Sequence, residues 1–399
     1  MKVRFEPWGA WVRLETLDAT VALDRDDARR FGLHGEDVWA EDGTSSADVG
    51  VSRARPLEVH LAVTSRCGVG CEGCYLDARP DGDEPSRDSL ERTLDAAAEE
   101  GAFTIAFGGG EPTLRKDLDE LAASARRRGL VPLVTTSATG LTDAKLERLA
   151  AFDQVNVSYD GPGSAYEDVR GVDRADEVER AIVRLVAHGI RVGVNVVLTR
   201  TTFPLLSTTL DRTAELGVRE VQLLRYKPQG RAKSLAYYAR RLTPAQVDAF
   251  PEVLAHSAER FAGRLSLRVD CALVPFLSAD PRFSEDPARL ARAGVFGCEA
   301  GRHLGAVRAD GYVAPCSFAD PTDARGDALG EAFATDATLA RFRDYPVAAP
   351  APCDTCAIAS TCRGGCKVVT SYVSGTFGPD PECPRVRGSR RLPRSPEAR

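Results

Sequence analysis

Short runs of β-branched and aliphatic residues alternate with amphipathic stretches between residues 57 and 270. Each run is typical of a buried strand, and each following stretch has helical periodicity. The predicted strands are 57–63, 103–107, 131–136, 154–161, 191–199 and 220–226. Apolar strands that alternate with helices indicate a parallel sheet covered by helices. The pattern therefore predicts an α/β fold with a partial, TIM-like (β/α)6 barrel, roughly three-quarters of a closed one.

Residues 1–52 precede this barrel and show a different pattern. The stretch 11–24 alternates between apolar and polar residues like a small hairpin, and 25–33 is typical of a short helix. We expect these residues to form a small N-terminal lobe, followed by the barrel domain at 53–270. An exposed strand of such a lobe could help to engage a peptide by pairing with it.

The chain after the barrel has few periodic segments. Residues 271–384 are rich in loops, with helical periodicity mainly at 327–344, and they include seven cysteines between 298 and 383. We expect this segment to form a cysteine-rich domain that folds around metal sites. The remaining residues, 385–399, are basic and rich in Pro, Ser and Arg, so we expect them to be disordered.

Composition and charge exclude several classes of partner. The chain has 399 residues, of which 43% are hydrophobic and 28% charged, as in an ordinary globular protein. A net charge of −6 gives no general attraction to phosphate or to an anionic membrane, and no basic groove with interleaved aromatic residues is present. No stretch approaches transmembrane length, and the start lacks the apolar run of a signal peptide. We expect a cytoplasmic protein with neither a nucleic-acid nor a membrane partner.

Eleven cysteines are many for a chain in a reducing compartment, where disulfides are not the default explanation. Three lie at 67–74, one at 271, and the others in the C-terminal segment. Such clusters indicate metal or cofactor sites, with buried, inert thiols as the alternative. Three cysteines within eight residues suit neither disulfide pairing nor a zinc or iron–sulfur site that is closed by four ligands.

A [4Fe–4S] cluster held by three thiolates leaves one iron free to bind a small molecule. The spacing Cys67-x3-Cys71-x2-Cys74, followed by Tyr75, resembles the signature of radical S-adenosylmethionine (SAM) enzymes. The loop follows the first predicted strand, at the end of the barrel where function is expected. The resemblance implies that the open iron binds the amino and carboxylate groups of SAM, next to Tyr75. The reduced cluster then cleaves SAM to a 5′-deoxyadenosyl radical that removes a substrate hydrogen. Gly73 departs from the family, which often has an aromatic or aliphatic residue there.

Two further stretches resemble parts of the SAM site in this family. Gly108-Gly109-Gly110-Glu111-Pro112, after the second predicted strand, resembles the family's GGE motif, which implies that Gly109, Gly110 and Glu111 bind SAM, the last two at its amine. A glycine-rich turn before a helix is the ordinary alternative.

After the fourth predicted strand, 158–171 resembles the family's Ser-x-Asp-Gly stretch, with an arginine twelve residues after the serine. The resemblance implies that Ser158 binds the SAM ribose and that Arg170 binds its carboxylate, an anion that suits a forked donor. Asp160 could simply cap a turn. The stretch 223–232 resembles the sixth-strand rim of members that modify peptides.

The C-terminal cysteines resemble the seven-cysteine pattern of the SPASM domain, which carries two auxiliary [4Fe–4S] clusters. The resemblance implies an outer cluster held by Cys353, Cys356, Cys362 and Cys383. It implies an inner cluster held by Cys298, Cys316 and Cys366. Two zinc sites are the alternative, because a C-x2-C spacing serves zinc equally well.

The inner set has only three cysteines. Sulfatase-maturing relatives have a further cysteine six residues before Cys298, where this chain has Arg292. The fourth ligand could be Cys271, a non-cysteine side chain or the substrate. Cys271 itself has three interpretations: a small buried hydrophobic residue, this missing ligand, or a thiol that donates hydrogen, as in some radical SAM epimerases.

Two polar residues bear on which reaction the protein could catalyse. Sulfatase maturases carry an aspartate base immediately after the position of Cys316, and here Ser317 follows instead, which argues against formylglycine formation. His60 lies within the first predicted strand, so we expect a polar residue of the barrel interior or a buried histidine with its hydrogen bonds satisfied, not a catalytic one.

The sequence therefore predicts a radical SAM/SPASM maturase that modifies a ribosomally made peptide oxidatively, for example by cross-linking it. The implied cofactors are SAM and three [4Fe–4S] clusters, one that binds SAM and two auxiliary. The implied partners are a peptide with a leader sequence and an electron donor such as flavodoxin or ferredoxin. The alternatives are a SPASM enzyme acting on a small molecule or cofactor precursor, a peptide epimerase with Cys271 as hydrogen donor, and a non-catalytic zinc or iron–sulfur scaffold.

Overall fold

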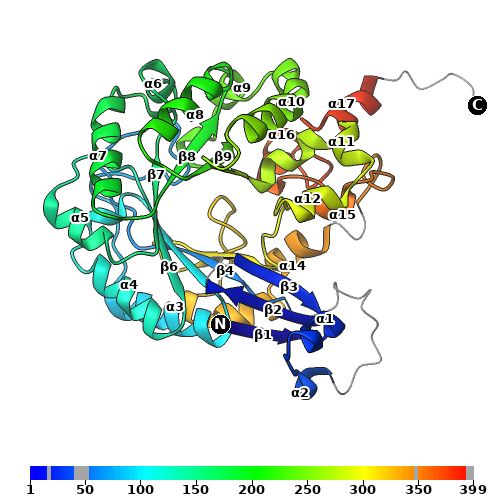
Figure 1. Cartoon of the computed structure of the whole chain (residues 1–399), viewed down its shortest axis with the longest axis horizontal. Coiled ribbons are helices and arrows are strands. Elements are labelled where there is room, and N and C mark those ends of the chain that lie inside the picture. Colours follow the sequence, from blue (N-terminus) through cyan, green and yellow to red (C-terminus); the bar gives the residue numbers. More distant parts are fainter. Residues whose placement is uncertain (16–18, 40–53, 346–348, 392–399) are drawn as a thin grey trace, which may run out of the picture.

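The computed structural model describes residues 1–15, 19–39, 54–345 and 349–391. Six parallel strands form the centre of a sheet that curves into a crescent with helices on its outer side (Figure 1). These strands are β4 (Glu58–Ala62), β5 (Thr104–Gly108), β6 (Val131–Thr136), β7 (Gln154–Ser158), β8 (Val192–Leu198) and β9 (Glu220–Arg225). The predicted partial (β/α)6 barrel is confirmed.

Each central strand leads into at least one helix. Ser86, Thr142 and Thr243 begin three of these helices, and each side chain accepts a backbone hydrogen bond from the first turn. Among the described residues, no helix is both long and apolar enough to span a membrane. The helices are α3 (Arg87–Glu99), α4 (Leu118–Arg127), α5 (Asp143–Leu149), α6 (Ser164–Arg170), α7 (Ala175–Ala187), α8 (Leu206–Glu215), α9 (Ala236–Arg240) and α10 (Pro244–Arg260).

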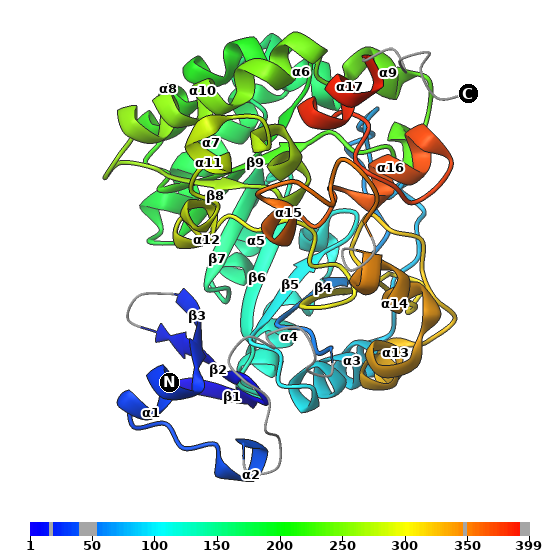
Figure 2. The same cartoon turned by 90° about the vertical axis from the view of Figure 1, so that its right-hand side faces the viewer.

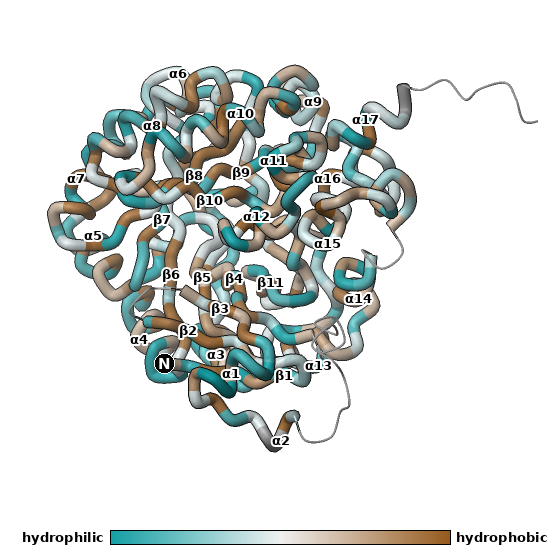
Figure 3. Tube along the Cα trace, turned by 45° about the vertical axis from the view of Figure 1, so that its right-hand side comes forward, coloured by the Kyte–Doolittle hydropathy of each residue, from teal (hydrophilic) through white to brown (hydrophobic). Residues whose placement is uncertain are grey.

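Alternation along each strand separates a core from a barrel interior. On β4, Val59 and Leu61 are fully buried in the hydrophobic core, whereas Glu58 and His60 are only partly buried. Because successive side chains of a strand point to opposite faces, Glu58 and His60 face the interior of the crescent. Hydrophobic residues are concentrated along β6 to β9 (Figure 3). The fold thus leaves room inside the barrel for polar groups.

Three short strands widen the sheet beyond the prediction. β10 (Ser266–Val269) pairs in parallel with β9, and β11 (Leu304–Val307) pairs in parallel with β4. β12 (Val313–Ala314) then pairs with β11 in the antiparallel sense. Strands of two to four residues carry too little periodicity to be recognised in a sequence. Part of the C-terminal segment therefore completes the sheet of the barrel.

The C-terminal segment contains more helix than its sequence pattern predicts. Residues 384–391 form helix α17, so the expectation of disorder from 385 onward is wrong for residues 385–391. Residues 392–399 lie outside the described part. Buried Val386 and a backbone hydrogen bond from Arg387 to Cys383 anchor this helix. The helical elements are η5 (Cys271–Leu277), α11 (Pro281–Ser284), α12 (Ala288–Arg292), η6 (Gly326–Ala328), α13 (Leu329–Thr335), α14 (Ala337–Asp344), α15 (Ala359–Cys362), α16 (Lys367–Ser374) and α17 (Pro384–Arg391).

The N-terminal lobe is a three-stranded antiparallel sheet with two short helices. Its elements are β1 (Lys2–Glu6), β2 (Gly9–Leu14), β3 (Ala19–Asp24), α1 (Arg25–Arg30) and α2 (Glu36–Trp39). Figure 2 shows the lobe at one end of the barrel. Arg4 donates a hydrogen bond to the carbonyl of Pro56 at 2.8 Å, and the Trp11 ring packs against His303. Pro56 and His303 precede β4 and β11, so the lobe contacts the amino end of the barrel.

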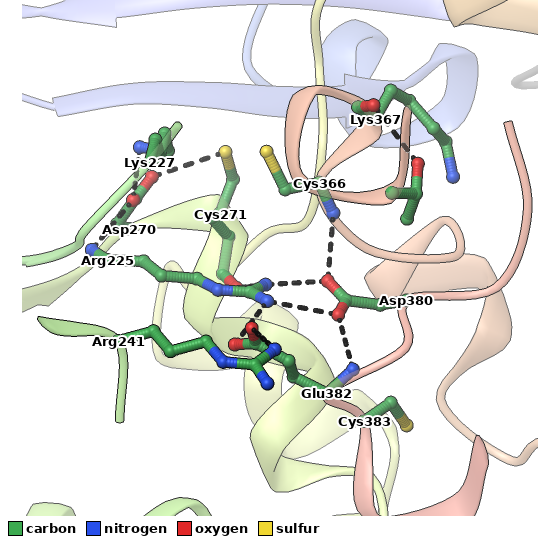
Figure 4. Close-up of polar contacts among 12 residues, drawn as sticks. Arg225, Lys227, Arg241, Asp270, Cys271, Cys366, Lys367, Asp380, Glu382 and Cys383 are labelled. Carbon is green, nitrogen blue, oxygen red and sulfur yellow. Dashed lines mark hydrogen bonds and ion pairs between the residues drawn. The ribbon is translucent and has the colours of Figure 1, made fainter. Parts of the chain in front are cut away.

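A buried ion-pair network joins β9 to the C-terminal cysteines. The Arg225 guanidinium contacts both carboxylate oxygens of Asp380, at 2.6 and 3.1 Å, and one of Glu382, at 2.8 Å (Figure 4). Asp380 also accepts a hydrogen bond from the backbone nitrogen of Cys366, and Glu382 precedes Cys383. The side chains of Arg225 and Asp380 are 3% and 1% exposed. The network therefore positions two cysteines against the barrel.

We expect Arg225→Met to lower the free energy of unfolding by about 3–5 kcal/mol, because it leaves the buried Asp380 carboxylate without its ion-pair partner. The matched control is Arg260→Met, which removes the exposed pair between Arg260 and Asp211 and should cost less than about 1 kcal/mol. Anaerobic urea unfolding of the cluster-loaded protein measures both. If the two substitutions lower the free energy of unfolding equally, the Arg225 network contributes no more to stability than an exposed ion pair does.

Candidate active site

The first cysteine loop lies at the carboxyl end of β4 and is held from two sides. The backbone nitrogen of Cys67 donates a hydrogen bond to the carbonyl of Arg79 at 2.8 Å. Arg231, which follows β9, donates from its backbone to the Cys74 carbonyl at 2.8 Å and from Nε to the Cys71 carbonyl at 2.9 Å. The three thiols are partly buried. Residues distant in sequence thus present the three cysteines together on the rim of the barrel.

Gly73, the departure from the family pattern, is explained by its neighbour. A Cβ atom at Gly73 would lie 3.1 Å from the ring of Tyr226, the residue that follows β9. The Tyr226 ring therefore lies against the space that a side chain at this position would begin to fill. The loop therefore keeps an aromatic neighbour at Gly73.

Backbone hydrogen bonds connect the glycine-rich stretch after β5 to the cysteine loop. The backbone nitrogen of Gly110 donates to the Thr64 carbonyl at 2.7 Å, and that of Glu111 donates to the Arg66 carbonyl at 2.8 Å. Gly109 has a φ of 118°, and a Cβ atom at Gly110 would lie 2.2 Å from the Arg66 carbonyl oxygen. Only glycine permits this approach of two backbones. The two predicted motifs therefore form one surface.

The Glu111 carboxylate is buried and accepts five hydrogen bonds. They come from the backbone and hydroxyl of Thr113, the hydroxyl of Thr136, and the backbone and hydroxyl of Ser137. Such contacts saturate the acceptor positions of a carboxylate. In this structure the side chain braces the glycine stretch, and the assignment of Glu111 to the SAM amine stays a prediction.

Arg170 and Ser158 lie on the same rim. Arg170, at the end of α6, donates from Nε to the fully buried Asp160 at 2.7 Å. Burial acts to lower the pKa of Arg170, but the charges of Asp160 and Cys71 raise it above its ordinary value. Asp160 also accepts a hydrogen bond from the backbone of Val197, so it orients the arginine rather than merely capping a turn. A permanent cation thus lies near the cysteine loop. Ser158, the last residue of β7, is partly buried.

Tyr75 and Phe318 join the first cysteine loop to the C-terminal segment. Their ring centroids are 4.5 Å apart, and the Lys227 ammonium lies 4.2 Å from the centre of the Phe318 ring. Burial raises the pKa of Tyr75 to about 12, and the charge of Cys74 adds to this effect. Lys227 itself pairs with Asp270 at 2.5 Å in a buried position. Phe318 is two residues after Cys316, so the first loop and the inner set of cysteines are neighbours.

Four thiols lie together where the C-terminal segment meets the first cysteine loop. They belong to Cys271, Cys298, Cys316 and Cys366. Burial, together with the charges of Cys298 and Cys366, raises the pKa of Cys316 to about 12. The same two cysteines act on Cys271, whose thiol contacts the Asp270 carboxylate at 3.3 Å. Figure 4 shows the sulfur atoms of Cys271 and Cys366 side by side. The inner set of three predicted cysteines is therefore accompanied by a fourth.

The four cysteines of the predicted outer set line a single pocket, together with Asp380 and Pro275. Burial, together with the charges of Cys383 and Cys356, raises the pKa of Cys353 to about 11. Ser278 contacts the Cys383 sulfur at 3.0 Å. A pocket surrounded by four thiols fits a cubic cluster with one cysteine at each iron. The members of the set are Cys353, Cys356, Cys362 and Cys383.

Within the described residues, no group of three or more His, Cys, Asp or Glu side chains closes around a single metal ion. A [4Fe–4S] cube distributes its ligands over separate iron atoms, which is a different requirement from gathering them on one ion. The donor sets here consist of thiols, the ligands that iron–sulfur clusters use.

Residues 61–206 match the family model of the radical SAM superfamily. The chain therefore contains a radical SAM domain. Its cofactors include SAM and a [4Fe–4S] cluster. The matched region begins within β4 and contains both the cysteine loop and the glycine stretch, the two motifs that the structure brings together.

Two curated relatives match this chain over most of their length. The PqqA peptide cyclase of Rhodopseudomonas palustris is 27% identical over 343 residues, which cover 82% of this chain and 86% of the relative. The mycofactocin maturase MftC of Mycobacterium tuberculosis is 28% identical over 361 residues, which cover 85% of this chain and 87% of the relative. The similarity therefore extends beyond the radical SAM domain into the C-terminal cysteines.

A solved structure shares the whole fold. Streptococcus suis SuiB, bound to its precursor peptide SuiA, has a TM-score of 0.73 and 17% identity, with 96% of this chain and 98% of that chain covered. At this identity the similarity establishes the fold, including the N-terminal lobe and the C-terminal segment.

Sequence reasoning missed the groups that hold the cysteines in place. Lys227 and Arg225 stand in the predicted rim stretch 223–232, but their partners Asp270 and Asp380 carry no motif. His60 was expected to have its hydrogen bonds satisfied, and it does bond through both ring nitrogens, to Ser317 and Glu58.

We expect Gly110→Ala to separate the glycine stretch from the cysteine loop and to lower SAM cleavage by about 10²-fold, as a misplacement of about 1 Å can do. The control is Gly68→Ala in the same loop, where a Cβ atom would meet nothing within 4 Å. Iron content after anaerobic reconstitution and 5′-deoxyadenosine formation are the measurements. Wild-type values for Gly110→Ala would contradict the close backbone approach.

Proposed function

We propose that this radical SAM enzyme is a SPASM-type maturase that oxidatively modifies a ribosomally made peptide. The observation that carries the proposal is the junction of the first cysteine loop and the inner thiols through Tyr75 and Phe318. An auxiliary cluster next to the SAM site can accept an electron from a substrate held between them. The full-length similarity to PqqA peptide cyclase and to the maturase MftC supports a peptide as the substrate.

The proposed SAM site uses the residues on the rim of the barrel. Cys67, Cys71 and Cys74 would hold the cluster that cleaves SAM, with Tyr75 beside it. Gly109, Gly110 and Glu111 would contact SAM, the last two at its amine. The partly exposed backbone of the glycine stretch supports this role for Gly110, whereas the Glu111 carboxylate already accepts hydrogen bonds from Thr136 and Ser137. Ser158 would bind the ribose, and Arg170 would bind the carboxylate. The bound cofactors supply a radical that removes a hydrogen atom from the substrate.

We propose two auxiliary [4Fe–4S] clusters in residues 271–384. Cys353, Cys356, Cys362 and Cys383 would hold the outer one, which their common pocket supports. Cys298, Cys316 and Cys366 would hold the inner one.

Cys271 is our choice for the fourth ligand of the inner cluster. Its sulfur lies beside that of Cys366, and the charges of Cys298 and Cys366 act on it. A hydrogen donor for epimerisation would need a thiol that faces the substrate, whereas this one is grouped with three other thiols. The buried Lys227 ammonium next to it offsets part of the negative charge of a thiolate cluster.

The N-terminal lobe is proposed to engage the leader part of the peptide. Strand β3 lies at the edge of its sheet, and a peptide can pair with such an edge. The lobe contacts the amino end of the barrel, so a bound leader would extend toward the interior from the side opposite the SAM loop. A one-electron donor such as flavodoxin or ferredoxin would reduce the cluster that cleaves SAM.

The proposed function is tested by anaerobic incubation with a small peptide encoded beside this gene. We expect the wild-type enzyme to remove two hydrogens from the peptide, Cys67→Ala to cleave no SAM, and Cys353→Ala to retain at least part of SAM cleavage. Peptide mass and 5′-deoxyadenosine are measured. An unchanged mass without uptake of solvent deuterium would favour a small-molecule substrate, and full SAM cleavage by Cys67→Ala would refute the assignment of the first cluster.

For Cys271, we expect Cys271→Ala to alter or remove the electron paramagnetic resonance signal of one auxiliary cluster, with the signal of the SAM-binding cluster unchanged. Cys353→Ala serves as the comparison, because it should affect the other auxiliary signal. If Cys271→Ala leaves all signals unchanged, the cysteine is not a ligand; loss of deuterium incorporation in that same variant would identify it as a hydrogen donor.

A further inference from the structure

A polar group inside the barrel connects β4 to the residue after Cys316. His60 Nδ1 lies 2.7 Å from the Ser317 hydroxyl, and His60 Nε2 lies 2.7 Å from the Glu58 carboxylate. The neighbouring strands place Ala106 and Ala306 opposite His60, so small side chains flank the imidazole. The His60 side chain keeps 34% of its surface exposed to the interior. The imidazole is therefore accessible as well as hydrogen-bonded.

The Glu58 carboxylate decides which nitrogen of a neutral His60 ring carries the proton. Burial acts to raise the pKa of Glu58, but the hydrogen bond from His60 and the positive charge of Arg268 help to hold it below its ordinary value. A charged carboxylate only accepts hydrogen bonds, so Nε2 donates to Glu58 and Nδ1 of the neutral ring is an acceptor. Ser317 then donates its hydroxyl proton to His60. The arrangement allows a proton to pass from Ser317 to His60, with Glu58 stabilising the resulting imidazolium.

Ser317 stands at the junction of the two reactive centres. It directly follows Cys316 of the inner set and precedes Phe318, whose ring packs against Tyr75 of the first loop. A substrate that loses a hydrogen atom at one centre and an electron to the other would lie close to the Ser317 hydroxyl.

We propose that Ser317, His60 and Glu58 form the path by which the substrate proton leaves during the oxidative step. This inference rests on the proposed function. Joining a carbon to a second atom X breaks one C–H and one X–H bond. The hydrogen atom of the C–H bond goes to the radical derived from SAM, the electron goes to the oxidised auxiliary cluster, and the X–H proton passes through Ser317 to His60 Nδ1.

The path explains how a serine can occupy the position at which sulfatase maturases carry an aspartate base. A serine hydroxyl is too weak a base to hold an additional proton near neutral pH, but it can accept the substrate proton while it passes its own to an imidazole within hydrogen-bond distance. The polar group on β4 thereby supplies the base that the residue after Cys316 lacks. A purely structural His60 would only tie the loop after Cys316 to the barrel.

The test compares His60→Gln, the double variant His60→Gln/Ser317→Asp and the surface control His188→Gln. Glutamine retains hydrogen bonding but cannot hold the proton. We expect His60→Gln to keep transferring substrate deuterium into 5′-deoxyadenosine, while the ratio of modified peptide to 5′-deoxyadenosine falls by at least about tenfold, the lower part of the range for general-base catalysis. The double variant should regain most of this ratio, because the aspartate accepts the proton directly, and His188→Gln should match the wild type.

The outcomes separate the two hypotheses. A wild-type ratio in His60→Gln, or a loss that Ser317→Asp does not restore, would overturn the proton path and leave the maturase function intact. Failure of the wild-type enzyme to transfer any peptide hydrogen into 5′-deoxyadenosine would overturn the proposed function and the path together.

Discussion

The Arg225 guanidinium is the interaction on which the arrangement of the site depends. It is buried at the end of β9 and pairs with two carboxylates, one of which also holds the backbone of Cys366. Removing charges from water is costly unless they are fully paired, so this geometry tolerates little displacement. Because Asp380 and Glu382 lie within three residues of Cys383, the position of the cysteine-rich segment follows from that of a barrel strand.

Contacts of the same kind continue from this network to the rim of the barrel. Lys227, two residues after Arg225, pairs with Asp270 beside Cys271 and lies over the ring of Phe318. Phe318 in turn packs against Tyr75, next to the last cysteine of the first loop. The three groups of cysteines are thus joined by a continuous series of buried and partly buried contacts. Such continuity suits electron transfer, which requires fixed and short separations between centres.

The sequence was most informative where the pattern is local. The strand at 131–136 and the helix after each barrel strand follow from periodicity, and the spacing of the cysteines located their groups. Pairings across the chain have no such signal: Arg225 and Asp380 are 155 positions apart, and His60 and Ser317 are 257 apart. β11 has only four residues, and α17 has the composition of a disordered tail, so tertiary packing decided both.

The pairing of β11 with β4 has a consequence for how the protein is made. During synthesis β4 emerges early, yet the strand that covers its outer edge lies far toward the C-terminus. Until β11 arrives, the barrel has an unpaired edge of the kind that readily pairs with other chains. The sheet therefore cannot be completed before residues 304–307, within the cysteine-rich segment, have been translated. Completion of the barrel is thereby coupled to synthesis of the segment that carries the later cysteines.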